Sequence, residues 1–292
     1  MKQILADHNL RLTRSLGQSF LHDGNQLQRI IHVAELTRAD RVLEIGPGLG
    51  PLTELLLRNA GEVLAIEKDA RLVRLLQERF AVEPTPATSA REETTPAPEH
   101  PGRFRLVHED ALDLLRRQQH DWSAWKLVAN LPYSVASPLL VELAQGGRGP
   151  QRIVATLQLE VARRLMAAPG QPDYGVLTLL LQLHYQPLTW FKIPAGCFFP
   201  QPDVDSACVC LARRQTARLP AELTPTFERL VKRSFSQRRK MMLKLLKNDW
   251  PLASLEHAFA RLALPPTTRA EAVGLEQFVG LVRELAADSS HA

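Results

Sequence analysis

The chain has 292 residues, of which 45% are hydrophobic and 23% charged, and its formal net charge is +5. This composition is typical of a soluble protein that is long enough for one large domain and a small one. No apolar run approaches the roughly 18–20 residues of a membrane span, and the first residues lack the apolar core of a secretory signal. Three cysteines are too few for a disulfide framework or a four-ligand zinc site. We therefore expect free thiols, no metal, no membrane contact and a cytoplasmic location.

From residue 41 to 158 the chain alternates short apolar runs with amphipathic stretches, as successive strand–helix units do. We predict strands at 41–45, 62–67, 104–108, 124–129, 153–158 and 207–213. We predict helices at 53–59, 69–80 and 159–167. This alternation predicts an α/β fold, with a right-handed, mostly parallel sheet and helices on both faces.

Residues 82–101 interrupt the pattern with five prolines, four threonines and four glutamates. Such a segment cannot bury enough apolar surface to offset the entropy of ordering it, so we predict a disordered insertion without a catalytic part. Beyond Pro220 the pattern is helical, and we predict helices at 224–248, 252–262 and 275–287. We therefore expect an N-terminal domain over 1–215 and a small all-helical domain over 216–292.

Positive charge is concentrated in the C-terminal part of the chain. Residues 211–292 hold 14 Lys or Arg against 8 Asp or Glu, whereas the rest holds 22 against 23. Residues 232–247 hold seven basic residues and no acidic one, and Phe235 stands among them. A solvated helix face would explain these charges. Cations interleaved with an aromatic ring are also what an RNA surface requires, to neutralise phosphates and to stack on bases.

A glycine-rich turn follows the first predicted strand and precedes a helix, in the segment Glu44-Ile-Gly46-Pro-Gly48-Leu-Gly50. Glycines let the backbone approach a ligand, and the helix N-terminus offers unpaired N–H groups. Gly46 and Gly48 are therefore candidate cofactor contacts. By itself the turn is weak evidence, because dinucleotide and nucleoside sites share it.

Two carboxylates make this prediction more specific. Glu67 ends the next strand, where it can accept hydrogen bonds from both hydroxyls of a ribose. Asp110 follows the third strand and is well placed to bond an adenine amino group. The alternative interpretation is that these residues, with Glu44, are capping or loop carboxylates.

The segment after the fourth strand, Asn130-Leu131-Pro132-Tyr133, indicates the reaction. Adenine N6 is a poor nucleophile because its lone pair is delocalised into the ring. The Asn130 side-chain oxygen and the Leu131 carbonyl, held by the proline, could accept both N6–H bonds and aim the lone pair at a methyl sulfonium. Tyr133 would stack on the extruded base. The alternative is a turn that only ends the strand, since Asn and Pro are both common there.

A series of motifs, in order and over nearly the whole chain, resembles the ribosomal RNA adenine dimethyltransferases, and within them the bacterial enzymes of the small subunit. The resemblance is carried by 15–21, 42–53, Glu67, Asp110, 130–133, 157–165 with Tyr174-Gly175, 198–206 and 235–240. It implies a Rossmann-like class I S-adenosylmethionine-dependent methyltransferase sheet, with a small helical domain that binds RNA.

The resemblance also implies roles for individual residues. The implied cofactor contacts are Ser19, Leu21, Gly46, Glu67, Asp110 and Asn130. The implied target-base site comprises Asn130, Leu131, Pro132, Tyr133 and Phe198, with Phe198 opposite Tyr133. The residues expected to contact RNA are Arg238, Arg239 and Lys240. The implied reaction is dimethylation of N6 of two adjacent adenines near the 3′ end of 16S rRNA in the immature 30S subunit, by a monomeric enzyme.

Departures from the family pattern include Ser19, where many relatives have Asn or His, and Asp203, where Lys is usual. Within the family, the alternative is a 23S rRNA methyltransferase of the macrolide-resistance type. Leu131, Tyr133 and the segment 204–206 favour the small-subunit enzyme. A ribosome-assembly factor without catalysis is a further alternative, which the intact Asn130 motif and Glu67 argue against. The basic C-terminal helices argue against a small-molecule methyltransferase.

Overall fold

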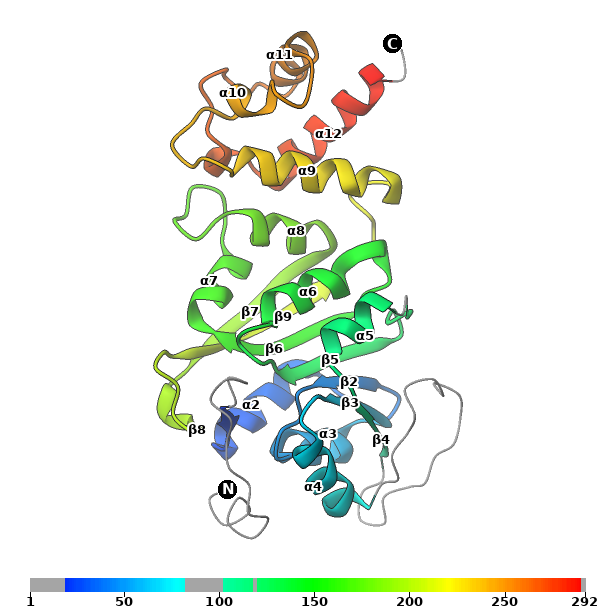
Figure 1. The fold of residues 1–292 in the computed structure, drawn as a ribbon. Helices are drawn as coiled ribbons and strands as arrows, with labels where there is room; N and C mark the ends of the chain where they lie inside the picture. Colours follow the sequence, from blue (N-terminus) through cyan, green and yellow to red (C-terminus); the bar gives the residue numbers. More distant parts are fainter. Residues whose placement is uncertain (1–18, 82–101, 118–119, 290–292) are drawn as a thin grey trace. The chain divides into compact units, whose positions relative to one another are not determined.

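The computed structural model describes residues 19–81, 102–117 and 120–289 (Figure 1). The predicted insertion at 82–101 lies outside the described residues, as does the start of the N-terminal motif, 15–18. The strands are β1 Phe20–Leu21, β2 Arg41–Ile45, β3 Glu62–Glu67, β4 Arg103–His108, β5 Trp125–Asn130, β6 Arg152–Gln158, β7 Tyr185–Ile193, β8 Phe198–Phe199 and β9 Ser206–Arg213. The helices are α2 Gly24–Ala34, α3 Pro51–Asn59, α4 Ala70–Phe80, α5 Ala111–Arg117, α6 Ala136–Ala144, α7 Leu159–Met166, α8 Val176–His184, α9 Thr224–Ser234, α10 Met242–Leu246, α11 Leu252–Arg261 and α12 Leu275–Ser289.

Seven strands form one sheet in the order β4-β3-β2-β5-β6-β9-β7. The pairs β4–β3, β3–β2, β2–β5 and β5–β6 are parallel, whereas β9 runs antiparallel to β6. A second, two-stranded sheet pairs β1 with β8 in antiparallel orientation. The predicted Rossmann-like α/β fold with a mostly parallel sheet is confirmed.

The central strand β5 shows why this sheet forms. Leu127, Val128 and Ala129 are all fully buried, although their side chains alternate between the two faces. Both faces are therefore covered, which is typical of a parallel sheet and explains the continuous apolar run. Val128 packs in one core with residues of α2, α3 and α4. The helices α5 and α6 pack against each other (Figure 1).

Local capping sets where the helices of this core begin. The Asp69 carboxylate accepts a hydrogen bond from Arg71 N (3.0 Å), so Asp69 is the N-cap of α4 and the helix starts one residue later than predicted. Asp23 caps α2 in the same way through Gln26 N (3.0 Å). Pro51 stands at the start of α3, where its missing N–H leaves no helical hydrogen bond unmade.

The single helix predicted over 224–248 is wrong, because α9 ends at Ser234 and α10 begins at Met242. Two serine hydroxyls bond back to the last turn of α9: Ser234 Oγ donates to Leu230 O and Ser236 Oγ to Arg233 O, each at 2.7 Å. Such side chains compete with the helical pattern and favour its end. Four further helices, α2, α5, α6 and α8, and the strand β7 were not predicted from the sequence.

The chain divides into two compact units, 1–162 with 187–213 and 163–186 with 214–292. In the second unit, residues of α9, α11 and α12 form a buried core, and the Tyr174 hydroxyl donates to Val273 O (2.8 Å). Residues 163–186 thus group with the C-terminal helices, which the sequence analysis did not indicate. The division into domains 1–215 and 216–292 stays a prediction, because grouping by contact does not show which segment folds alone.

All three cysteines are free thiols, as predicted, with Cys208 and Cys210 buried on β9 and Cys197 partly exposed. Within the described ranges, no helix is both long and apolar enough to cross a membrane.

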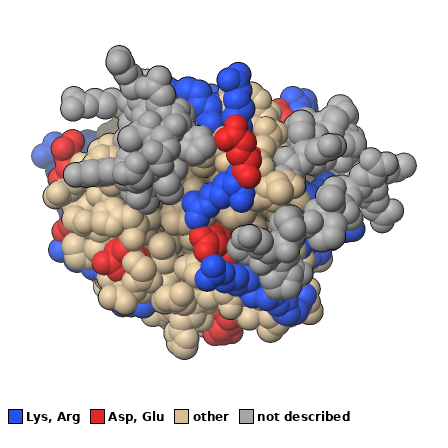
Figure 2. Space-filling model, turned by 90° about the horizontal axis from the view of Figure 1, so that it is seen from below, with Lys and Arg blue, Asp and Glu red and all other residues tan. Residues whose placement is uncertain are grey.

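Charge is mixed on the face seen from below in Figure 2, where Lys and Arg are interspersed with Asp and Glu. Ion pairs of the first unit include Arg79 with Glu54 and Arg71 with Asp69, both at 2.6 Å. Arg79 and Glu54 are partly exposed, and such pairs contribute about 0–1 kcal/mol, whereas Asp69 is buried. The charges shown there therefore do not form a uniformly basic surface.

Candidate active site

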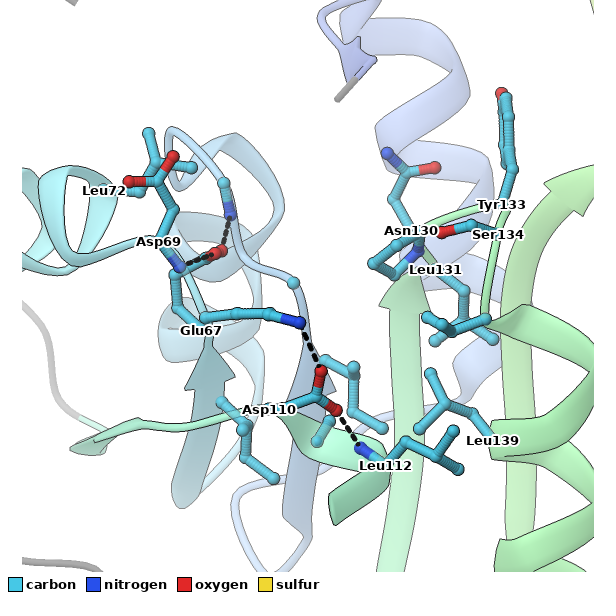
Figure 3. Close-up of a pocket in the computed structure, with 18 of the residues that line it drawn as sticks. Glu67, Asp69, Leu72, Asp110, Leu112, Asn130, Leu131, Tyr133, Ser134 and Leu139 are labelled. Carbon is cyan, nitrogen blue, oxygen red and sulfur yellow. Dashed lines mark hydrogen bonds and ion pairs between the residues drawn. The ribbon is translucent and has the colours of Figure 1, made fainter. Parts of the chain in front are cut away.

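A cavity of about 240 Å³ lies at the carboxyl ends of β2, β3 and β5 (Figure 3). The strand order reverses here, because β3 lies on one side of β2 and β5 on the other. In open α/β sheets, ligands bind outside the carboxyl ends of the strands at such a switch point. Nine residues predicted for the site line this cavity: Ser19, Gly46, Gly48, Glu67, Asp110, Asn130, Leu131, Pro132 and Tyr133.

The turn after β2 depends on glycine. Gly46 and Gly48 have positive φ angles of 69° and 62°. A Cβ at Gly46 would lie 3.3 Å from the Pro132 ring, and a Cβ at Gly48 would lie 2.6 Å from the Phe20 ring. The positive φ angles disfavour other residues at both positions, and the contact with Phe20 leaves no room for a Cβ at Gly48. The main chain therefore borders the cavity directly, as a close approach to a ligand requires.

Glu67, at the end of β3, is 7% exposed. Its Oε2 accepts from Gly48 N (3.2 Å) and its Oε1 from Asp69 N (2.9 Å), as the dashed lines in Figure 3 mark. Burial raises the pKa of Glu67, and these two N–H groups oppose that shift. Each carboxylate oxygen has two lone pairs, so Glu67 keeps acceptor capacity toward ligand hydroxyls while it holds the glycine turn.

Asp110 stands between β4 and α5 and caps the helix. Its Oδ1 accepts from Leu112 N (2.8 Å) and Asp113 N (3.3 Å), and its Oδ2 accepts from Lys68 Nζ (2.7 Å). Burial raises the pKa of Asp110, but hydrogen bonds from Lys68 and the two N–H groups outweigh it, and the pKa lies below its usual value. Asp110 is therefore an anion fixed at the rim of the cavity.

Asn130, the last residue of β5, has an oriented side chain. Its Nδ2 donates to Ser19 O (3.0 Å), and a carbonyl can only accept, so this bond assigns the amide orientation. The Asn130 Oδ1 is buried and has no hydrogen-bond partner among the described residues. Buried polar atoms normally have partners. An unpaired acceptor beside a cavity therefore indicates a place for a donor from a ligand.

Tyr133 projects from the end of β5 on the same side as Asn130 (Figure 3). Its hydroxyl lies 2.5 Å from Ser206 Oγ, at the start of β9. Burial raises the pKa of Tyr133, which the Ser206 hydroxyl opposes. The hydrogen bond holds the phenol at one end while the ring stays partly exposed to the cavity.

Leu21 and Phe198 lie outside the lining of the cavity. They are partners in the β1–β8 register, and each is 2% exposed. A base can stack on Phe198 only if the side chains over it move. The predicted cofactor contact of Leu21 and the predicted stacking on Phe198 both stay predictions. Phe20, which the sequence analysis did not assign a role, lines the cavity instead.

The basic segment of the second unit lies between α9 and α10, where Arg238, Arg239 and Lys240 are exposed. The Phe235 ring packs against Tyr174 and Phe278, with ring centroids 6.1 Å apart in both pairs. The ring belongs to the packing of this unit and is also partly exposed, so the expectation that Phe235 offers a stacking platform stays a prediction. The RNA contacts predicted for the three cations stay predictions.

Lys68, Asp69 and Glu109 also line the cavity, and none of them was predicted from the sequence to belong to the site. Their positions directly beside Glu67 and Asp110 are the signal that could have found them. In the described part of the chain, no three His, Cys, Asp or Glu side chains are close enough together to hold a metal ion.

The sequence profile of the family described as ribosomal RNA adenine dimethylase matches residues 9–287. The chain belongs to this family. Two of its relatives are named ribosomal RNA small subunit methyltransferase A. The one from Opitutus terrae is 37% identical over 292 residues and the alignment covers 97% of each chain. The one from Latilactobacillus sakei is 34% identical, over 96% of this chain and 92% of the relative.

Two solved structures share the fold. The 23S rRNA methyltransferase ErmE is 25% identical, with a TM-score of 0.66 over 91% of this chain and 99% of that chain. A dimethyladenosine transferase from Plasmodium falciparum has a TM-score of 0.72 over 92% of this chain and 98% of that chain. At 23% identity, the second likeness concerns the fold alone.

The buried carboxyl group of Glu44 has a raised pKa. The side chain stands on β2, is 1% exposed, and lies near the buried Thr53 hydroxyl. Neither Glu44 Oε2 nor Thr53 Oγ1 makes a regular hydrogen bond within the described residues. Burial raises the pKa of Glu44 to about 8, the Thr53 hydroxyl opposes this shift, and the charge of Glu67 adds to it. Glu44 is therefore mostly protonated at neutral pH.

Replacing Glu44 with Gln should make the protein more stable than wild type at high pH. The unfolded chain loses this proton near pH 4.5 and the folded chain near pH 8, so folding takes up a proton between these values. Between pH 5 and pH 8, the free energy of unfolding of the wild type should therefore fall by on the order of 3 kcal/mol more than that of Glu44→Gln. Urea unfolding at several pH values measures this. Glu222→Gln, which removes an exposed carboxyl, is the control. Parallel curves for wild type and Glu44→Gln would contradict the prediction.

Proposed function

We propose that this protein transfers methyl groups from S-adenosylmethionine to N6 of two adjacent adenines near the 3′ end of 16S rRNA, in the immature 30S subunit. The observation that carries the proposal is the Asn130 amide, whose buried oxygen has no partner among the described residues and borders the same cavity as Glu67 and Asp110. The names of the relatives from Opitutus terrae and Latilactobacillus sakei support the choice of the small subunit.

The cavity fits the nucleoside part of S-adenosylmethionine. The Gly46 turn brings main chain against the ligand, Glu67 keeps acceptor capacity for two ribose hydroxyls, and Asp110 is an anion at the rim for the adenine amino group. When bound, S-adenosylmethionine supplies an electrophilic methyl group on a sulfonium. The residues of the chain hold and orient the reacting groups and take no covalent part.

Asn130 and Leu131 would activate the target base. The Asn130 Oδ1 accepts one N6–H bond and the Leu131 carbonyl the other, which draws the N6 lone pair out of conjugation with the ring. The hydrogen bond from Asn130 Nδ2 to Ser19 O keeps the acceptor oriented before the base arrives. Preorganised acceptors of this kind act where positive charge develops on N6.

Tyr133 would stack on the extruded adenine, a contact that any base offers and that fixes the plane of the ring. The hydrogen bond between its hydroxyl and Ser206 Oγ limits the rotation of the phenol. The second aromatic of the target site, Phe198, would join the stack after the base displaces the side chains that now bury it.

The relatives named for the small subunit are 34% and 37% identical to the chain, whereas the 23S rRNA methyltransferase ErmE is 25% identical. This difference favours the small-subunit substrate over the 23S alternative. The protein would act as a monomer.

The function is tested by incubating the protein with labelled S-adenosylmethionine and immature 30S subunits, followed by digestion and identification of the modified nucleoside. The expected product is N6,N6-dimethyladenosine in 16S rRNA. Label only in 23S rRNA of a matched 50S sample would support the alternative, and no label in either would contradict the proposal.

Asn130→Ala should slow methyl transfer by about 10²–10³ with little change in the binding of either substrate, because its contact to N6 is strongest in the transition state. Single-turnover kinetics on 30S particles measure the chemical step, and calorimetry measures cofactor affinity. Asn59→Ala on α3, which also loses an amide bonded to a carbonyl, is the matched control. A near-normal chemical step in Asn130→Ala would refute the mechanism.

Replacing Arg238, Arg239 and Lys240 with Ala should weaken 30S binding and reduce the slope of log affinity against log salt by up to about 2–3, since each phosphate contact contributes about 0.7–0.9. Cofactor affinity should not change. The control replaces Arg218, Arg261 and Arg283, three cations of the same unit that lie outside residues 232–247. An equal loss of slope in both triple variants would count against a specific role for 238–240.

A further inference from the structure

The end of β3 carries a lysine that the proposed reaction does not use. Lys68 follows Glu67 directly, and its Nζ lies 2.7 Å from Asp110 Oδ2. Both Lys68 and Asp110 line the cavity, and the dashed line at the upper oxygen of Asp110 in Figure 3 marks this ion pair. The Lys68 ammonium group is thus paired with the carboxylate that is proposed to accept from the adenine amino group.

Lys68 is not needed to orient Asp110. The Oδ1 of Asp110 accepts from Leu112 N at 2.8 Å and from Asp113 N at 3.3 Å, which fixes the carboxylate at the start of α5. The remaining oxygen, Oδ2, accepts from Lys68 and keeps one lone pair for a further donor. Removing the lysine charge would therefore leave the carboxylate in place and make Oδ2 more available to another donor.

The ion pair can open at small cost. The side chain of Lys68 is 64% exposed and that of Asp110 is 26% exposed, so water solvates the ammonium group after the contact breaks. Exposed ion pairs of this kind change binding or stability only a few-fold. An adenine amino group that enters the cavity can donate to the same oxygen, beside the ammonium group or in its place, and the ammonium charge weakens that oxygen as an acceptor.

We propose that Lys68 sets how strongly and how selectively the cavity binds the adenine ring, by competing with the adenine amino group for Asp110 Oδ2. This proposal rests on the proposed function, because it takes the adenosyl group as the ligand. Lys68 is a specificity-determining residue in this scheme and has no part in methyl transfer.

Selectivity follows from the hydrogen-bonding groups at C6 of the purine. Adenine carries an amino group there, which can donate to the Asp110 carboxylate and is repelled by the Lys68 ammonium group. Hypoxanthine carries a carbonyl oxygen at C6, which the Asp110 carboxylate repels and the Lys68 ammonium group can donate to. The wild-type Lys68–Asp110 pair therefore accepts both adenine and hypoxanthine. A cavity without the lysine charge should prefer adenine over hypoxanthine more strongly.

The test compares Lys68→Met, which keeps the apolar stem without the charge, with Lys68→Arg, which keeps the charge. Calorimetry on the full chain measures the affinity for S-adenosylhomocysteine and for S-inosylhomocysteine. We expect Lys68→Met to bind the adenosyl ligand about two- to fivefold more tightly and the inosyl ligand more weakly, and Lys68→Arg to keep the wild-type ratio. Raising the salt concentration should narrow the difference between wild type and Lys68→Met, because salt screens the ion pair.

Lys192→Met is the matched control. It removes another exposed Lys–Asp pair, Lys192 with Asp205 at 2.6 Å, outside the lining of the cavity, and it should leave both affinities unchanged. An unchanged ratio of the two affinities in Lys68→Met would overturn the proposal, and so would weaker binding of the adenosyl ligand. Neither result would touch the proposed function, whereas a wild-type protein that binds no S-adenosylhomocysteine would overturn both.

Discussion

The parallel pairing of β2 with β3 on one side and with β5 on the other is the constraint on which the site depends. Because all three strands point the same way, their carboxyl ends meet at one edge of the sheet. Gly46, Glu67 and Asn130 each stand at or directly after such an end, although Gly46 and Asn130 are 84 positions apart in the sequence. The Gly48 N–H then ties the turn after β2 to the Glu67 carboxylate, so the floor of the cavity is one connected structure.

The positions of the chemistry-bearing residues could be predicted from the sequence, because they follow from local signals. Strand ends are marked by apolar runs, and the turn after β2 is marked by its glycines. The hydrogen-bond partners could not be predicted in this way. Asn130 is oriented by a carbonyl 111 residues away, and Asp110 is paired with a lysine 42 residues away. Neither partner belongs to a pattern that periodicity or spacing reveals.

The surroundings of individual side chains are harder to predict from the sequence than the type of an element. Phe235 stands among cations in the sequence, and nothing there indicates that Tyr174 and Phe278 pack against its ring. Leu21 and Phe198 are buried because β1 and β8 pair with each other, and strands of two residues give no usable signal in a sequence. No glycine or proline stands between Ser234 and Met242, so the end of α9 was missed.

The contact between Asn130 and the carbonyl of Ser19 has a consequence for how the N-terminal segment can change during evolution. A main-chain carbonyl is present whatever the side chain, so this contact exerts little selection on the identity of residue 19. Its placement depends instead on the pairing of Phe20 and Leu21 with β8, one residue further along the chain. An insertion or deletion just before Phe20 would still leave a main-chain carbonyl directly ahead of β1, so the contact also tolerates a change in the number of residues there. What constrains this point of the chain is the register of β1 with β8, together with the Ser19 hydroxyl, which donates to Pro200 O (2.8 Å).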